Sequence, residues 1–285
     1  MSPDTRSGRG LVDLVKAPLR RLRADYRVLT GSLRGWPSVL VIGAQRSGTT
    51  SLFNYLAQHP DVRVPLGKEI HYFDLHYDRG LAWYRGRFPY SRQLQRGALT
   101  LDASPYYLLH PLAPERAAQL LPQVKLIALL RNPVERAVSH YQHEVRGGRE
   151  PLSLPDALEA EAERTAGEEE RLAREPGYYS FPHHRYTYQR RGIYLDQLQR
   201  WLRHYDRSRL LIMQSERLFR DPVGATAVVH DFLGLRPHRL EHYQPFLYGG
   251  YDRTLPPALR ERLTAFFAPH NRRLFDWLGE EYDWA

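Results

Sequence analysis

The chain has 285 residues, a formal net charge of +9 and no cysteine. The lack of cysteine excludes a disulfide-stapled fold, and no apolar run approaches the ~20 residues that span a bilayer. With 42% hydrophobic residues, a chain of this length can bury one large core, so we expect a single-domain, soluble and cytoplasmic protein.

The positive charge is concentrated at the N-terminus. Residues 1–36 hold eight Lys or Arg residues against three Asp residues. Leucine and valine recur between the basic residues at helical spacing, which predicts a basic amphipathic helix: Leu11, Leu14, Val15, Leu19 and Leu22. We favour a helix packed on the domain surface over peripheral contact with an anionic membrane. No nucleic-acid recognition motif accompanies the charge, so residues 1–36 are predicted to be a basic extension of a domain that spans residues 37–285.

Short apolar runs and helical periods alternate along the rest of the chain. Strands are predicted at 39–42, 98–101, 124–130 and 209–213, with a further short apolar run at 62–65. Helices are predicted from Thr50 onward and at 77–88, 111–121, 133–146, 193–205, 222–233 and 256–278. This alternation predicts an α/β fold with a P-loop-type, doubly wound parallel sheet flanked by helices.

One segment, residues 151–192, interrupts the alternation. Its first half is acidic and predicts a solvated helix, and its second half mixes Tyr, His and Arg without a period. Such a loop beside an active site would recognise a substrate, and elsewhere it would be a plain surface excursion. The sequence leaves both interpretations open.

The stretch "GAQRSGTT", residues 43–50, joins the first predicted strand to the first helix. Backbone N–H groups of a Gly-rich turn at the positive end of a helix bind anions. Arg46 adds a fixed positive charge, and Ser47, Thr49, Thr50 and Ser51 add hydroxyl donors. A nucleotide triphosphatase would continue with Lys and Ser or Thr after the second glycine, where this chain has two threonines. The loop therefore predicts a phosphate-like ligand without the usual magnesium site.

A second anion site is predicted at "LLRNPVERAVSHYQH", residues 129–143. Arg131 follows a buried strand, and Ser139 falls two turns along the next helix. Ligands of a doubly wound sheet lie at the carboxyl ends of its strands, so both side chains should reach the crevice of the first loop. Alternatively, Arg131 caps a carbonyl or pairs with Glu135.

Together the two motifs resemble those of the sulfotransferase family, whose donor is 3′-phosphoadenosine 5′-phosphosulfate (PAPS). "AQRSGTTSL" resembles the 5′-phosphosulfate loop, and "RNPVERAVSHY" resembles the 3′-phosphate motif. "GKEIHYFDLHYDRGLAWYRGRFP", "DASPYYL" and "RGIYLDQLQRWLRHY" resemble further segments of its carbohydrate branch, which includes heparan-sulfate-type and bacterial enzymes. The similarity extends from about Ser38 to Trp284.

The resemblance implies roles for individual residues. Donor binding falls to Arg46, Ser47, Gly48, Thr49, Thr50, Ser51, Arg131, Ser139 and Tyr251. Glu69 is implied as the base that takes the acceptor proton, and Arg46 and His143 as further catalytic groups. Lys68, His71 and Asp102 are implied as acceptor-side residues, and no metal is required.

The chain also departs from the family pattern. Arg46 stands where the family usually has Lys, Ala103 stands where heparan-type enzymes often have Lys, and "LYGGYDRTLPP" keeps Tyr251 without the usual lysines. A P-loop kinase and a non-catalytic nucleotide-binding protein remain as alternatives. The resemblance implies transfer of a sulfuryl group to a hydroxyl group, or to an amine, of a small-molecule or saccharide acceptor. The sequence leaves a saccharide, a lipid headgroup and an aromatic natural product open as that acceptor.

Overall fold

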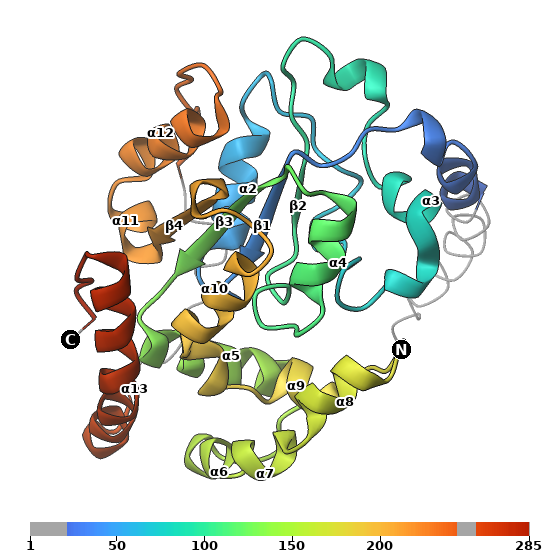
Figure 1. The fold of residues 1–285 in the computed structure, drawn as a ribbon. Coiled ribbons are helices and arrows are strands. Elements are labelled where there is room, and N and C mark those ends of the chain that lie inside the picture. Colours follow the sequence, from blue (N-terminus) through green and yellow to red (C-terminus); the bar gives the residue numbers. More distant parts are fainter. Residues whose placement is uncertain (1–21, 244–254, 285) are drawn as a thin grey trace, which may run out of the picture.

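A parallel β-sheet lies at the centre of the structure, a computed structural model that describes residues 22–243 and 255–284 (Figure 1). Its strands are β1 (Val39–Gly43), β2 (Leu101–Ala103), β3 (Lys125–Leu130) and β4 (Leu210–Gln214). They lie in the order β2-β1-β3-β4, and every pairing is parallel. All of β1 and nearly all of β3 are buried, as continuous apolar strands in a sheet covered on both faces should be.

Helices cover both faces of the sheet, as the doubly wound prediction requires. On one face the buried cluster joins alternate residues of β1 and β3 to helices α4, α10 and α13. On the other face the remaining strand residues pack against α2 and α12 (Figure 1). These helices are α2 (Thr49–Ala57), α4 (Ala113–Leu120), α10 (Tyr194–Leu202), α12 (Pro222–Leu233) and α13 (Pro257–Leu278).

Helix α5 (Pro133–Arg146) begins where its sequence predicts. Pro133 occupies its first turn, and the Asn132 side chain accepts hydrogen bonds from the backbone N–H groups of Val134 and Glu135. This cap fixes the direction in which α5 leaves the end of β3. It therefore places the side chains of the first turns of α5 beside the loop after β1.

The strand predicted at 98–101 was placed too early. The structure pairs Leu99 with Val62 in an isolated bridge, and β2 itself runs Leu101–Ala103 beside β1. A charged residue at position 102 obscured the strand in the sequence. Asp102 fits inside the sheet because hydroxyl groups donate hydrogen bonds to its carboxylate.

The helix predicted at 77–88 is shorter than expected. It consists of a 3₁₀ turn, Tyr77–Arg79, followed by α3 (Gly80–Arg85), because Gly80 adopts a φ of 78° between them.

The segment 151–192 likewise contains several short helices in place of one acidic helix. They are α6 (Leu154–Glu159), α7 (Glu161–Thr165), α8 (Glu168–Arg174), α9 (Phe181–Arg185) and the 3₁₀ turn Arg190–Gly192.

The described part of the predicted N-terminal extension packs on the domain. Residues 22–29 are helical, and Arg27 donates hydrogen bonds to the carbonyls of Gly86 and Phe88 at 2.5 and 3.0 Å. Arg34 also donates to the Phe88 carbonyl, at 3.0 Å. Residues 1–21 lie outside the described part. Within the described residues, no helix is both long and apolar enough to cross a membrane.

Candidate active site

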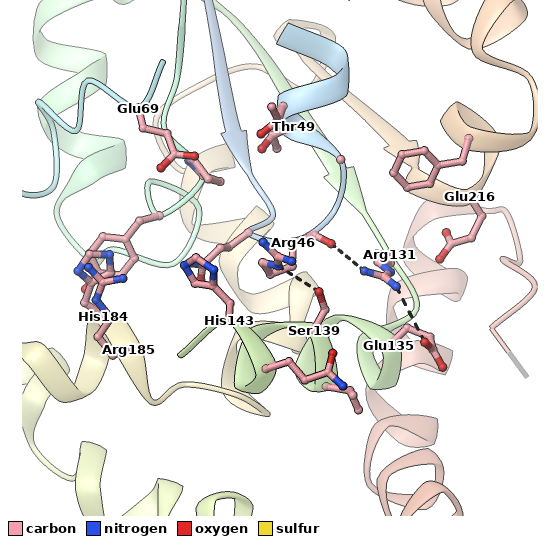
Figure 2. A pocket seen from close by; sticks show the side chains of 18 of the residues that line it. Arg46, Thr49, Glu69, Arg131, Glu135, Ser139, His143, His184, Arg185 and Glu216 are labelled. Atoms are coloured by element: carbon pink, nitrogen blue, oxygen red, sulfur yellow. Dashed lines mark hydrogen bonds and ion pairs between the residues drawn. The ribbon is translucent and has the colours of Figure 1, made fainter. Parts of the chain in front are cut away.

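A pocket of about 770 Å³ opens at the carboxyl ends of the central strands. Its wall is formed by the loop after β1, the first turns of α5, the segment around Glu69, and α11 (Ser215–Arg220) after β4 (Figure 2). This is the location at which doubly wound sheets bind ligands. The pocket therefore brings together both predicted anion motifs and Glu69.

The loop after β1 is shaped for an anion. Gly48 has a φ of 86°, and a Cβ atom there would lie 2.8 Å from the Phe219 ring, so only glycine fits. Helix α2 follows with no side-chain cap and no acidic residue in its first turn. Thr49 and Thr50 line the pocket. The first N–H groups of α2 and the positive end of its dipole are therefore presented to a ligand.

Arg46 and Arg131 lie next to one another in the pocket wall. Arg46 donates from Nε to the Ser139 hydroxyl at 3.0 Å, and its backbone has a φ of 69°. Arg131 donates from Nη1 to the Arg46 carbonyl at 3.1 Å, and its Nη2 lies 3.9 Å from the Glu135 carboxylate (Figure 2). Both structural alternatives for Arg131, carbonyl capping and pairing with Glu135, thus occur at a residue that also lines the pocket.

Other residues of the predicted donor site face elsewhere. The side chains of Ser47 and Ser51 are buried and do not line the pocket. The Ser47 carbonyl accepts a hydrogen bond from Ser215 at 2.6 Å, which joins the loop to α11. Tyr251 lies outside the described residues.

Glu69 faces the pocket within a chain of charged groups. Lys68 donates to its carboxylate at 2.6 Å, and His71 Nε2 lies 3.6 Å from the other carboxylate oxygen. On its far side, His71 Nδ1 lies 2.8 Å from Asp74. Lys68 itself is not part of the pocket wall. The backbones of Glu69 and His71 have φ values of 61° and 55°, a conformation that residues other than glycine adopt uncommonly.

These contacts fix the charge of both side chains at neutral pH. Burial acts to raise the pKa of Glu69, but His71 and Lys68 outweigh it and lower the pKa to about 2. Burial acts to lower the pKa of His71, but the carboxylates of Asp74 and Glu69 raise it to about 10. His71 is therefore a cation held between two carboxylates, and Glu69 remains ionised.

Asp102 does not reach the pocket, contrary to its predicted position on the acceptor side. It is fully buried and accepts hydrogen bonds from Ser104 at 2.7 Å, Tyr107 at 2.8 Å and Tyr84 at 3.1 Å. Burial, only partly offset by these hydroxyl groups, raises the pKa of Asp102 to about 6. The Ser104 hydroxyl also accepts a hydrogen bond from the His71 backbone at 2.9 Å. Asp102 thus supports the Glu69 segment from behind.

His143 lines the pocket from the third turn of α5, with its side chain 39% exposed. Burial, and next the positive charge of Arg46, lower the pKa of His143 below its ordinary value. Its imidazole is therefore neutral at physiological pH. Figure 2 shows His143 beside Arg46, between the donor loop and the segment that carries His184 and Arg185.

The comparisons with known proteins agree with this geometry. Residues 37–247 match the family model described as a sulfotransferase domain. This chain belongs to the sulfotransferase family. It is 32% identical to mouse heparan sulfate glucosamine 3-O-sulfotransferase 6 over 88% of this chain and 74% of that protein. It is 31% identical to human heparan sulfate glucosamine 3-O-sulfotransferase 3B1 over 87% of this chain and 65% of that protein.

A solved structure shows the same relationship. A sulfotransferase from Alicyclobacillus acidocaldarius is 31% identical to this chain and superposes with a TM-score of 0.67, covering 88% of this chain and 99% of that one. The sulfotransferase prediction and the fold prediction are confirmed, and the kinase and non-catalytic alternatives are set aside.

Sulfotransferases use PAPS as co-substrate, and the residues of this pocket suit such a ligand. PAPS carries a 5′-phosphosulfate and a separate 3′-phosphate. The uncapped N-terminus of α2 and Arg46 form one positive region, and Arg131 with Ser139 forms the neighbouring one. Within the described residues, no group of three or more His, Cys, Asp or Glu side chains is arranged to hold a metal ion.

Sequence reasoning missed several residues of the pocket wall. Phe219, Arg220 and Glu216 follow the end of β4, a position that the strand-end rule should have singled out. His184 and Arg185 come from the aromatic and basic half of the segment 151–192, for which two interpretations had been left open. The other missed residues lie within or beside the motifs quoted above, but their side chains were not singled out: Gln45, Leu75, Pro105, Tyr106, Val138, Gln142, Leu255 and Arg260.

Gln45 is held in one orientation by a buried cation. Arg191 is 1% exposed, and it donates to the Gln45 side-chain oxygen and to the His184 carbonyl at 2.9 Å. Because a guanidinium only donates, the amide nitrogen of Gln45 must point the other way. Gln45 lines the pocket, so Arg191 fixes the orientation of one polar side chain of its wall.

Proposed function

We propose that this sulfotransferase transfers the sulfuryl group of PAPS to a hydroxyl group of a glucosamine-containing saccharide. The observation that carries the proposal is the position of Glu69. Its ionised carboxylate faces the same pocket as Arg46 and the uncapped N-terminus of α2. A base and an anion-stabilising loop across one cavity are the two requirements of an in-line transfer to a hydroxyl.

At the donor end, the chain supplies fixed positive groups. The first N–H groups of α2 and the guanidinium of Arg46 would stabilise the negative charge that grows on the bridging oxygen of the leaving phosphate. The Ser139 hydroxyl holds Arg46, and the carbonyl of Arg46 in turn holds Arg131. The two parts of the donor site are therefore coupled through one residue.

At the acceptor end, Glu69 would take the proton of the attacking hydroxyl. The oxygen–sulfur bond forms, the bond from sulfur to the bridging phosphate oxygen breaks, and adenosine 3′,5′-bisphosphate leaves. A carboxylate with a pKa of about 2 is a weak base, so it accepts the proton only as the new bond acidifies the hydroxyl. His71 and Lys68 keep this carboxylate ionised and oriented.

The acceptor side of the pocket supports a saccharide. Tyr106 and His184 both line it, stack on one another with their ring centroids 4.3 Å apart and are only 2% and 6% exposed, so they form a rigid part of its wall. Arg185 lines the same region and offers a positive charge. The relatives named above act on heparan sulfate glucosamine, which supports the same class of acceptor here.

Sulfur-labelled PAPS and a panel of acceptors would test this proposal. We expect label transfer to glucosamine-containing oligosaccharides and little transfer to phenols or lipid headgroups. Transfer to a phenol alone would overturn the saccharide assignment while leaving the sulfotransferase chemistry intact.

We also propose a cytoplasmic location in which the N-terminal helix, packed on the domain through Arg27, turns its exposed side chains toward a membrane surface. Leu22, Leu29 and Leu33 are 66%, 82% and 61% exposed, next to a sequence rich in Arg. Exposed apolar and basic side chains together favour an anionic lipid surface. Sedimentation with phosphatidylglycerol vesicles should fall when Leu22 and Leu29 are changed to Ser. Equal sedimentation of variant and parent would remove the membrane from this account.

A further inference from the structure

Three charged side chains meet at one edge of the pocket. The Glu135 carboxylate lies 3.0 Å from Nη1 of Arg260 and 3.9 Å from Nη2 of Arg131. Arg131 follows β3, Glu135 is in the first turn of α5, and Arg260 is in the first turn of α13. All three line the pocket. One carboxylate is thus bracketed by two guanidinium groups from separate elements.

A carboxylate at this position is unexpected in an anion site. The neighbouring carboxylate of the pocket wall, Glu216, has structural partners, since it accepts from the Asn132 backbone at 2.9 Å and from Trp284 at 3.3 Å. Glu135, by contrast, makes its ion pairs with two arginines of the pocket. It therefore stands in the position that an anionic ligand of those arginines would take.

We propose that Arg260 is a further ligand of the donor 3′-phosphate and that Glu135 competes with this phosphate for Arg260 and Arg131. The inference rests on the proposed use of PAPS. A phosphate carries more charge and more acceptor oxygens than a carboxylate, so it displaces Glu135 from both guanidinium groups. Glu135 keeps the two side chains in place and weakens nucleotide affinity.

The chain supplies a matched control for each half of this proposal. Arg262 lies two residues further along α13 and pairs with Glu159 at 2.7 Å. Arg260 and Arg262 are similarly exposed, at 44% and 47%, but neither Arg262 nor Glu159 lines the pocket. Removing either arginine changes the net charge equally, so a difference between them reports on direct contact.

The test is titration calorimetry of residues 1–285 with adenosine 3′,5′-bisphosphate and with adenosine 5′-phosphate. Arg260→Ala should weaken binding of the bisphosphate about tenfold or more, as expected for a charge-assisted hydrogen bond, with little change for the monophosphate. Arg262→Ala should change neither. Glu135→Gln should strengthen binding of the bisphosphate several-fold, and Glu159→Gln should not.

The outcomes separate this inference from the proposed function. One outcome is that the parent protein prefers the bisphosphate and that Arg131→Ala abolishes this preference while Arg260→Ala does not. Arg260 would then be no ligand of the phosphate, and the inference would fail while the donor assignment stands. Unchanged or weaker bisphosphate binding by Glu135→Gln would overturn the competition. If the parent binds both nucleotides equally, the PAPS assignment itself fails.

Discussion

Replacing Glu69 by Gln separates its role as a base from a role as a structural ion pair. The substitution keeps the shape of the side chain and removes its charge. Glu69 is 46% exposed, and its closest contact is the 2.6 Å ion pair with Lys68. Exposed ion pairs contribute about 0–1 kcal/mol, so the variant should remain folded. Loss of a positioned base should lower kcat roughly 10²-fold or more, equivalent to about 2.7 kcal/mol of barrier.

The assay combines turnover, nucleotide binding and thermal unfolding on one preparation. We expect adenosine 3′,5′-bisphosphate to bind Glu69→Gln nearly as it binds the parent, because the ion pairs of Glu69 are with Lys68 and His71, whereas Arg131 and Ser139 are hydrogen-bonded to Arg46. Glu159→Gln, which also breaks an exposed ion pair but lies outside the pocket, is the control and should be fully active. Near-normal kcat for Glu69→Gln would refute the base, and an inactive variant that has also unfolded would indicate a structural pair.

Three further predictions concern the donor site and the core. Arg131→Ala should weaken adenosine 3′,5′-bisphosphate by roughly 1.5–3 kcal/mol more than adenosine 5′-phosphate in calorimetry, and equal losses would show that Arg131 is only structural. Gly48→Ala places a methyl group 2.8 Å from the Phe219 ring at a φ of 86°, so nucleotide affinity should fall at least about tenfold; parental affinity would contradict the proposed rigidity of the loop. Burial, and next the charge of the nearby His59, lower the pKa of His230 from 6.5 to about 4. Between these two pH values, His230 therefore binds a proton in the unfolded state and not in the folded state. Stability in denaturant should therefore fall as pH drops through this window, and less steeply in His230→Gln; identical slopes would exclude His230 as a cause.

Much of the fold could be predicted because its signals are local. Helix α5 has its proline, its asparagine cap and its apolar face within a few residues, and its predicted bounds match the structure. The strand β2 was misplaced because its buried carboxylate, Asp102, is satisfied in part by the hydroxyl group of Tyr84, which comes from α3. A sequence pattern does not show a partner that only the folded chain supplies.

The sequence predicted some residues of the candidate site and missed others, as it did for the fold. Arg46, Arg131 and Ser139 follow from strand ends and helix spacing, and the structure brings them together. The resemblance singled out Glu69 and His71. It did not show that Asp74 pairs with His71, because that contact forms in a turn whose backbone is irregular. Arg260 lies more than one hundred residues from Glu135, so no local pattern could have joined them.

The most direct test of the account is label transfer from sulfur-labelled PAPS to a glucosamine-containing oligosaccharide in excess EDTA. The account assigns stabilisation of the leaving group to Arg46 and the N-terminus of α2, and the loop continues with Thr49 and Thr50 in place of the Lys and Ser or Thr of a magnesium site. It therefore predicts full transfer in EDTA by the parent protein and at least about 10²-fold slower transfer by Glu69→Gln. Transfer that stops on chelation and returns with Mg²⁺ would contradict the account.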